Sequence, residues 1–318
     1  TCRTAARPTH RSSAVAALPE KPGVFAIVPG DTKSSTLVQR ILSEDPDQVM
    51  PPSDSHLKLS MAEKEILVRW VKEGAVFEKH WAYVRPEKDA LPKVKQADWV
   101  TSPMDVFVLA RLEKEGLAPE AEAAALTLIR RLHLDITGLP PTRSEVASFV
   151  ADKGVGRWER LVDRLLASPH YGERMALPWL DLARYADTHG YQADTYRNMW
   201  PWRDWVLRAF NDNMPFDQFT IEQLAGDMLP EAKESQIVAS GFNRNHRVNT
   251  EGGVIAEEYR IEYVADRTET TGAVWMGLTM NCCRCHDHKY DSLSQEDYYS
   301  LFAYFNNVPE NGKAGKEP

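Results

Sequence analysis

The chain has 318 residues, enough for two domains, and 43% of them are apolar with charges of both signs, which is typical of a globular protein. Its formal charge of -8 argues against a nucleic acid partner, because no basic stripe is present to displace counterions from a phosphate backbone. No run approaches the roughly 20 apolar residues of a transmembrane helix. The chain starts at Thr1 without the apolar core of a signal peptide, so we interpret this start as a cut end with any targeting signal upstream.

Capped, periodic segments follow one another along the chain. Residues 60–74 begin with a capping box, Ser60 and Glu63, and end at Gly74, which predicts a helix. Residues 102–116 show the same pattern of an N-cap, an apolar stripe and a final glycine, with Ser102 as the N-cap, and also predict a helix. Similar patterns begin at Thr142, Arg157, Pro201 and Ser294. Because alternating strand patterns are nearly absent, the sequence predicts a mostly α fold, with a small helical module followed by a larger all-α domain.

The boundary between these parts is expected at residues 86–98, where two prolines and charges of mixed sign replace any periodicity. We therefore expect an N-terminal domain at 1–85, this linker, and a helical domain at 99–307. The polar residues 308–318, rich in Gly, Pro and Lys, are typical of a linker that leads to a further C-terminal domain.

The segment NCCRCHDHKYD, residues 281–291, holds three of the four cysteines. Within it Cys282, Cys285 and His286 form C-x-x-C-H, the attachment signature of c-type haem. Two thiols three positions apart on a helical turn can both reach the vinyl groups of the haem, and the next histidine supplies the proximal ligand to the iron. The motif predicts a covalently attached haem c, with Cys282 and Cys285 as the thioethers.

Other interpretations of the cysteines remain open. Cys282, Cys285 and His288 could form part of a zinc or iron knot, although such sites usually draw ligands from a second cysteine pair, which this chain lacks. A disulfide or simple buried thiols are the other alternative, and Cys283, which haem attachment leaves unused, favours it.

The sixth ligand of such a haem is not fixed by the sequence, because no methionine follows His286. Met276, Met280 or a histidine could take that position, and so could a residue outside this chain. His246, in a polar loop beside two glycines, is one candidate for a distal ligand or site residue.

A second feature lies at Met50-Pro51-Pro52, before a short loop and the helix predicted at 60–74. This arrangement resembles the last third of a small cytochrome c domain. The resemblance implies that Met50 would be an axial ligand of the iron. That module's own C-x-x-C-H would precede Thr1, so Met50 belongs to a separate, incomplete module rather than to the haem at His286.

Together these features resemble the planctomycete-type multi-domain cytochrome c proteins over residues 26–307. In that family a cytochrome c domain precedes a helical domain of unknown function that carries C-x-x-C-H. Matching segments include RRLHLDITGLPPT, YGERMALPWLDLARYADTHGY and SQEDYYSLFAYFNN. The resemblance implies haem, electron transfer or redox sensing with an unknown redox partner, and export to the periplasm, because covalent haem attachment takes place outside the cytoplasm.

Enzymatic activity remains an alternative. Four carboxylates share one predicted helix face: Glu258, Glu262, Asp266 and Glu269. Such a row suits metal binding or acid–base catalysis, but more often it is a solvated face. Arg260 and Arg267 are expected to neutralise part of its charge. Aromatic residues crowd another segment, as a ligand-facing wall or as core: Tyr191, Tyr196, Trp200, Trp202 and Trp205. Asp287, His288 and Asp291 could support a haem histidine or act beside it. The alternative function is an exported enzyme, such as a glycan-directed hydrolase, with a structural or non-haem metal cluster.

Overall fold

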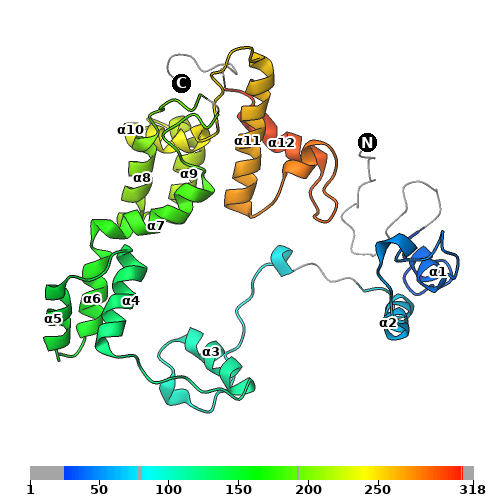
Figure 1. The fold of residues 1–318 in the computed structure, drawn as a ribbon, viewed down its shortest axis with the longest axis horizontal. Coiled ribbons are helices and arrows are strands. Elements are labelled where there is room, and N and C mark those ends of the chain that lie inside the picture. Colours follow the sequence, from blue (N-terminus) through cyan, green and yellow to red (C-terminus); the bar gives the residue numbers. More distant parts are fainter. Residues whose placement is uncertain (1–24, 77–80, 192, 309, 311–318) are drawn as a thin grey trace. The chain divides into compact units, whose positions relative to one another are not determined.

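The computed structural model describes residues 25–76, 81–191, 193–308 and 310. These residues form α-helices joined by loops and short 3-10 turns, and the described part contains no β-strand, which confirms the mostly α fold class (Figure 1). The helices are α1 (Thr36–Leu42), α2 (Met61–Lys72), α3 (Pro103–Lys114), α4 (Ala125–Thr137), α5 (Arg143–Ala151), α6 (Arg157–Leu166), α7 (Pro169–Leu182), α8 (Trp200–Asn211), α9 (Phe216–Ala225), α10 (Glu234–Ala239), α11 (Ala256–Met276) and α12 (Gln295–Phe305).

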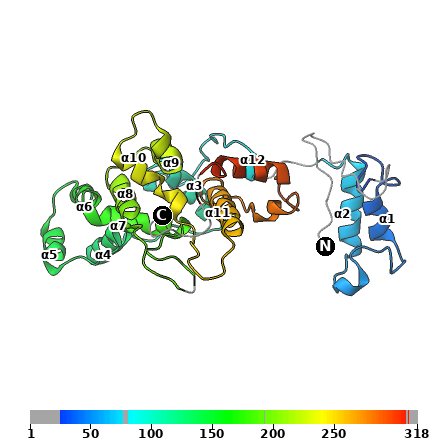
Figure 2. The same ribbon diagram turned by 90° about the horizontal axis from the view of Figure 1, so that it is seen from above.

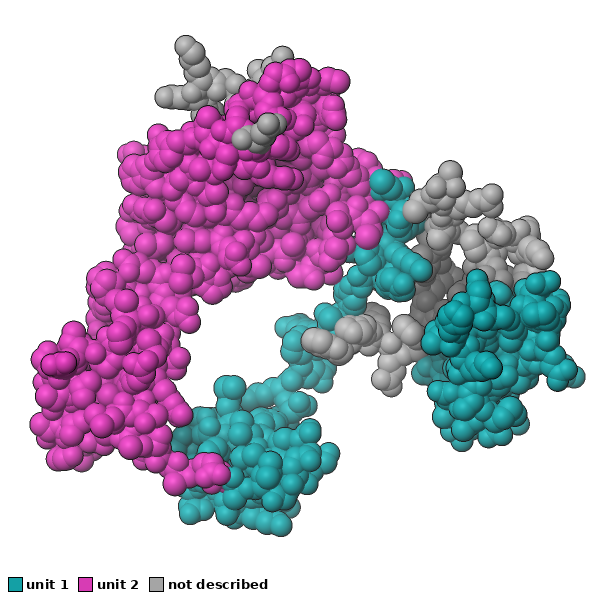
Figure 3. All heavy atoms as spheres, in the orientation of Figure 1, with its two compact units in different colours: residues 1–118, 285–294 teal, residues 119–284, 295–318 magenta. Residues whose placement is uncertain are grey.

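The chain divides into two compact units, coloured separately in Figure 3. The first comprises residues 1–118 and 285–294, and the second comprises residues 119–284 and 295–318. No helix or strand occurs within residues 86–96, the larger part of the linker expected at residues 86–98. The unit boundary lies after α3, so the domain limits at 85 and 99 stay a prediction, and residues 1–24 and 311–318 lie outside the described part.

The helix starts follow the predicted caps. At α2 the Ser60 hydroxyl accepts a hydrogen bond from Glu63 N at 3.3 Å, while the Glu63 carboxylate accepts one from Ser60 N at 2.7 Å. Thr142 and Glu145 form the same reciprocal pair at α5, at 3.3 and 2.7 Å. Each pair satisfies backbone donors that a helix N-terminus otherwise leaves without partners, so these helices begin where the sequence indicates.

Within the second unit, α4, α5 and α6 share a small core formed by Ile129, Phe149, Leu161 and Leu165. A larger core lies between α7, α8, α9 and α10 and contains Trp202, Trp205 and Phe219. The helices α7 and α8 approach closely at Gly172, where an added Cβ would lie 2.4 Å from the Leu207 carbonyl oxygen. Only glycine permits that approach, because any other side chain would meet the α8 backbone.

The long helix α11 is joined to this core by Trp275, whose ring centroid lies 4.8 Å from that of Trp179. Helix α12 lies alongside α11 in both views (Figure 1 and Figure 2). The cysteine cluster comes between these two helices in the chain, and α11 and α12 flank it in sequence. None of the helices in the described ranges has the length and hydropathy that crossing a bilayer requires.

Candidate functional site

The chain reverses direction after α11 and returns to the helix before it reaches the cysteines. Leu278 N donates a hydrogen bond to Gly272 O at 3.0 Å. Met280 is buried, with 3% of its surface exposed, and its sulfur fills the space in which a Cβ on Gly272 would lie. This close contact fixes the start of a short 3-10 helix, η6 (Asn281–Arg284), that carries the first part of the motif.

Arg284 anchors η6 to both flanking helices. Its guanidinium forms a two-pronged ion pair with Glu262 of α11, with one of the bonds at 2.9 Å, and this pairing lowers the pKa of Glu262. Its carbonyl oxygen accepts hydrogen bonds from Gln295 Nε2 at 3.2 Å and from the Tyr299 hydroxyl at 3.0 Å. The backbone between the two motif cysteines is therefore held in place from α11 and α12.

The three clustered cysteines lie in different environments. Cys282 and Cys285 are exposed, whereas Cys283 is fully buried with 0% of its surface accessible. None of the three forms a disulfide, so the disulfide interpretation is wrong for this segment and the buried-thiol interpretation applies to Cys283 alone. The boundary between the two units falls at Arg284, with Cys282 on one side and Cys285 on the other.

The ring of His286 is half-buried and oriented by its own backbone. Its Nδ1 lies 2.7 Å from the carbonyl oxygen of Asp287, and a carbonyl can only accept, so Nδ1 carries the proton. The lone pair of the neutral ring is then on Nε2. Histidines that bind metals usually donate their other ring N–H in this way, which fixes the tautomer and the ring plane.

His288 has the opposite tautomer. Its Nδ1 accepts hydrogen bonds from Asp291 N at 2.8 Å and Tyr290 N at 3.2 Å, and His288 N donates to Leu293 O at 2.8 Å. The residue closes the loop rather than presenting a ligand through Nδ1. In the described ranges no three His, Cys, Asp or Glu residues form a group that could hold a metal ion.

The carboxylates on α11 have partners that their spacing did not indicate. Asp266 forms a two-pronged ion pair with Arg184, with one bond at 2.6 Å, and Glu262 pairs with Arg284. Burial raises the pKa of Glu269, which accepts a hydrogen bond from the Tyr298 hydroxyl at 3.2 Å. These contacts join α11 to its neighbours, so the row of carboxylates has a structural role.

The arginines expected to balance that row pair elsewhere. Arg260 binds Glu257 through two hydrogen bonds of 2.8 and 2.9 Å, and Arg267 forms a two-pronged ion pair with Glu310. The expectation that they neutralise the row is wrong, because helical spacing gives the side on which a residue lies but not its tertiary neighbour. Glu258, the first carboxylate of the row, is exposed.

His246 is buried and both of its ring nitrogens have partners. Nδ1 donates to Arg247 O at 2.9 Å, and Nε2 accepts from Arg267 Nη2 at 2.8 Å. Burial and the Arg267 charge lower the pKa of His246 to about 3. With Nε2 engaged, His246 in this arrangement has no lone pair for a distal iron ligand.

The methionines considered as iron ligands differ in exposure. Met276 is 48% exposed at the end of α11, whereas Met280 is packed against Gly272. Met50 lies in the first unit, 37% exposed, and its backbone N donates to Arg40 O at 3.0 Å. Its role as an axial ligand of a separate module stays a prediction.

The side chains of the aromatic segment divide between the core and the surface. Trp202 and Trp205 are 2% and 3% exposed and belong to the large core, as the commoner interpretation of such crowding expects. Tyr196 and Trp200 are 66% and 45% exposed and do not.

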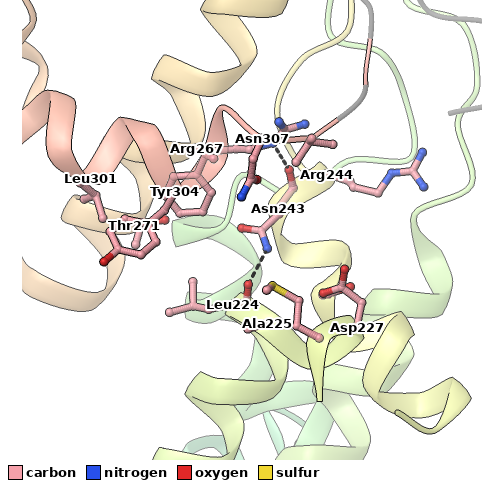
Figure 4. Close-up of a pocket in the computed structure, with 14 residues that line it drawn as sticks. Leu224, Ala225, Asp227, Asn243, Arg244, Arg267, Thr271, Leu301, Tyr304 and Asn307 are labelled. Carbon is pink, nitrogen blue, oxygen red and sulfur yellow. Dashed lines mark hydrogen bonds between the residues drawn. The ribbon is translucent and has the colours of Figure 1, made fainter. Parts of the chain in front are cut away.

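Two adjoining cavities lie in the second unit, away from the motif. One, of about 720 Å³, lies between η4–η5 (Gly226–Met228 and Ser240–Arg244), α11 and α12 (Figure 4). The other, of about 690 Å³, lies between η5 and the segment that leads into α8. Neither is lined by Cys282, Cys285 or His286. Sequence reasoning missed two of their residues, Arg197 and Arg244, because isolated arginines in loops carry no motif.

Two family models match parts of this chain. Residues 11–54 match the family model described as Planctomycete cytochrome C, and residues 103–310 match the model described as PSCyt2, Protein of unknown function (DUF1549). No curated protein and no solved structure matches. The two matches occur in the order that the sequence resemblance implies, and the second covers more than half of the chain. The chain therefore belongs to the PSCyt2 family of proteins of unknown function, and its residues 11–54 are similar to planctomycete cytochrome c.

Proposed function

We propose that this protein is a c-type cytochrome that carries one haem covalently on Cys282 and Cys285, with His286 as the proximal iron ligand. The observation that carries the proposal is the exposure pattern of the cysteines. Of three thiols within four positions, the two at the C-x-x-C spacing are exposed, and Cys283 is buried. The thiol that haem attachment would leave unused is the one that the fold withdraws from reaction.

The state of His286 also supports the proposal. With its proton on Nδ1 and directed to Asp287 O, the ring has its lone pair on Nε2, the form that an iron ligand needs. The anchoring of η6 through Arg284 holds the backbone on which Cys282 lies. The donor set thus fits a covalently bound haem, which when bound would supply one-electron chemistry.

The role that follows is electron transfer or redox sensing with a redox partner of unknown identity. Both motif thiols are exposed, so the thioethers would form at the protein surface, where another protein can approach. Covalent attachment implies maturation outside the cytoplasm, so we place the protein in the periplasm or another exported compartment. The matched cytochrome c segment supports the same assignment.

Intact mass spectrometry of the chain, exported in a host with haem-attachment machinery, tests the proposal. The wild-type protein should carry the added mass of one haem, and the attachment should survive denaturation because thioethers are covalent. The double variant Cys282→Ala/Cys285→Ala should lose that mass. Cys283→Ala is the matched control and should keep it. A wild-type chain with the mass of the bare polypeptide would refute the proposal, and so would retention by the double variant.

The histidine and Met50 are tested on the same material. His286→Ala should retain a covalent haem but with an altered absorption spectrum, because the axial ligand changes while the thioethers remain. Met50→Leu should leave the spectrum unchanged, because we assign Met50 to a separate module. A changed spectrum in Met50→Leu would contradict that assignment.

A further inference from the structure

The cavity of about 690 Å³ is lined by a buried arginine that lacks a full set of partners. Arg197 is 5% exposed, and its Nη1 donates to His246 O at 3.0 Å, but its buried Nε has no hydrogen-bond partner in the described part of the chain. A buried donor without an acceptor costs roughly 1–3 kcal/mol, and more if it is charged. The fold therefore keeps an unfavourable group at this wall.

A second arginine lines the same cavity and also the adjoining one. Arg244, at the end of η5, is solvent-accessible, and the described residues give its guanidinium no ion pair. In Figure 4 its side chain extends away from Leu301 and Tyr304, on the side of the cavity where Asp227 lies. Arg267, in contrast, is paired with Glu310, which also acts on Arg244 without forming an ion pair with it.

The arginines influence one another. Burial and then the Arg244 charge lower the pKa of Arg197, and burial and then the Arg267 charge lower the pKa of Arg244. Mutual repulsion of this kind is unfavourable unless an anion lies between the cations. The lining of the cavity of about 690 Å³ holds two guanidinium groups, those of Arg197 and Arg244, and one carboxylate, that of Asp227. Outside the lining, Asp187 acts on Arg197 and Glu310 acts on Arg244, and each raises the pKa of its arginine in part.

The rest of the lining indicates what accompanies the anionic group. Trp202 is 2% exposed and its indole N–H, a donor, lacks a partner, while Asn198, Ser240 and Asp227 add hydrogen-bonding groups of both kinds. The volume is that of a cavity for an organic molecule rather than for a single inorganic ion. Donors and acceptors together suit hydroxyl groups, which need both.

We propose that this cavity binds a hydroxylated organic oxyanion, a small molecule whose carboxylate or sulfate group lies between Arg197 and Arg244. The planar guanidinium groups would hold two oxygens of that group, and Asp227, Ser240 and Asn198 would contact the hydroxyls. The proposal is independent of haem attachment, because none of these residues belongs to the C-x-x-C-H motif.

Isothermal titration of the full chain at low ionic strength tests this site with four probes: glucuronate, galactose 6-sulfate, neutral galactose and inorganic sulfate. At least one of the two charged sugars should bind, and which one binds tells whether the carboxylate or the sulfate is recognised. Neutral galactose should bind at least tenfold more weakly. Equal binding of neutral galactose would overturn the proposal, as would inorganic sulfate that binds as tightly as the charged sugars, and so would the absence of binding by both of them.

Variants locate the binding. Arg244→Gln, at an accessible position, should weaken binding of the charged sugar about 10- to 100-fold, as expected for loss of a hydrogen-bonded charge. Arg244→Lys should weaken it less, since the charge remains. Arg208→Gln removes the same charge from an exposed position on α8 outside both cavities and should leave the affinity unchanged. Equal weakening by Arg208→Gln and Arg244→Gln would show a general charge effect and overturn the site.

Discussion

Acidification should destabilise the second unit through His246. In the folded chain this ring is 6% exposed, stacks on Tyr263 with a centroid distance of 4.6 Å, and receives a hydrogen bond from Arg267 on Nε2. A proton on Nε2 would remove that acceptor and place a second cation beside the guanidinium. Burial, which disfavours the charged ring, and then the Arg267 charge lower the folded pKa of His246 to about 3 from an ordinary value of 6.5.

The pKa difference sets the direction and size of the effect. Above pH 6.5 the ring is neutral in both states and contributes no pH dependence. Below that value the unfolded chain binds a proton that the folded chain does not, so stability falls as the pH drops from about 6.5 toward about 3. Each unit costs about 1.4 kcal/mol, so at pH 5 the loss relative to pH 7 is about 2 kcal/mol.

Urea unfolding followed by tryptophan fluorescence at pH 7 and pH 5 measures this loss. The variant His246→Gln retains a donor and an acceptor in the side chain but does not titrate. Burial also lowers the pKa of His133 and His189, and both residues are present in the two proteins, so their contributions cancel in the comparison. The wild type should lose about 2 kcal/mol more than His246→Gln between the two pH values. Equal losses would refute the reasoning.

Two further predictions concern packing and capping in the second unit. Gly172→Ala should lower the free energy of unfolding by about 1–3 kcal/mol, because the new methyl group meets the α8 backbone. The control is Gly252→Ala, whose methyl group meets nothing within 4 Å. Similar losses in both variants would contradict the packing argument. Thr142→Ala should cost about 1 kcal/mol by removing the acceptor for Glu145 N at the start of α5. Both are measured by the midpoint of urea unfolding, and an unchanged midpoint for Thr142→Ala would show that the cap does not contribute.

The sequence by itself determined the helical class and several helix starts, because caps and apolar periodicity are local: Ser60 with Glu63 and Thr142 with Glu145 lie within one turn of each other. It also contained the C-x-x-C-H spacing and the order of the two family matches. These features need no knowledge of distant neighbours.

Only the tertiary structure decided which cysteine is buried and which charges meet. The burial of Cys283 depends on how the chain returns against α11, through the contact of Met280 with Gly272. The partner of Asp266 is Arg184, 82 residues away, and not the nearby Arg267. Arg197 and Arg244 line one cavity because the loop before α8 folds against η5. Long-range packing sets ion pairs and cavities, since helical spacing places a side chain on a face but does not specify what that face contacts.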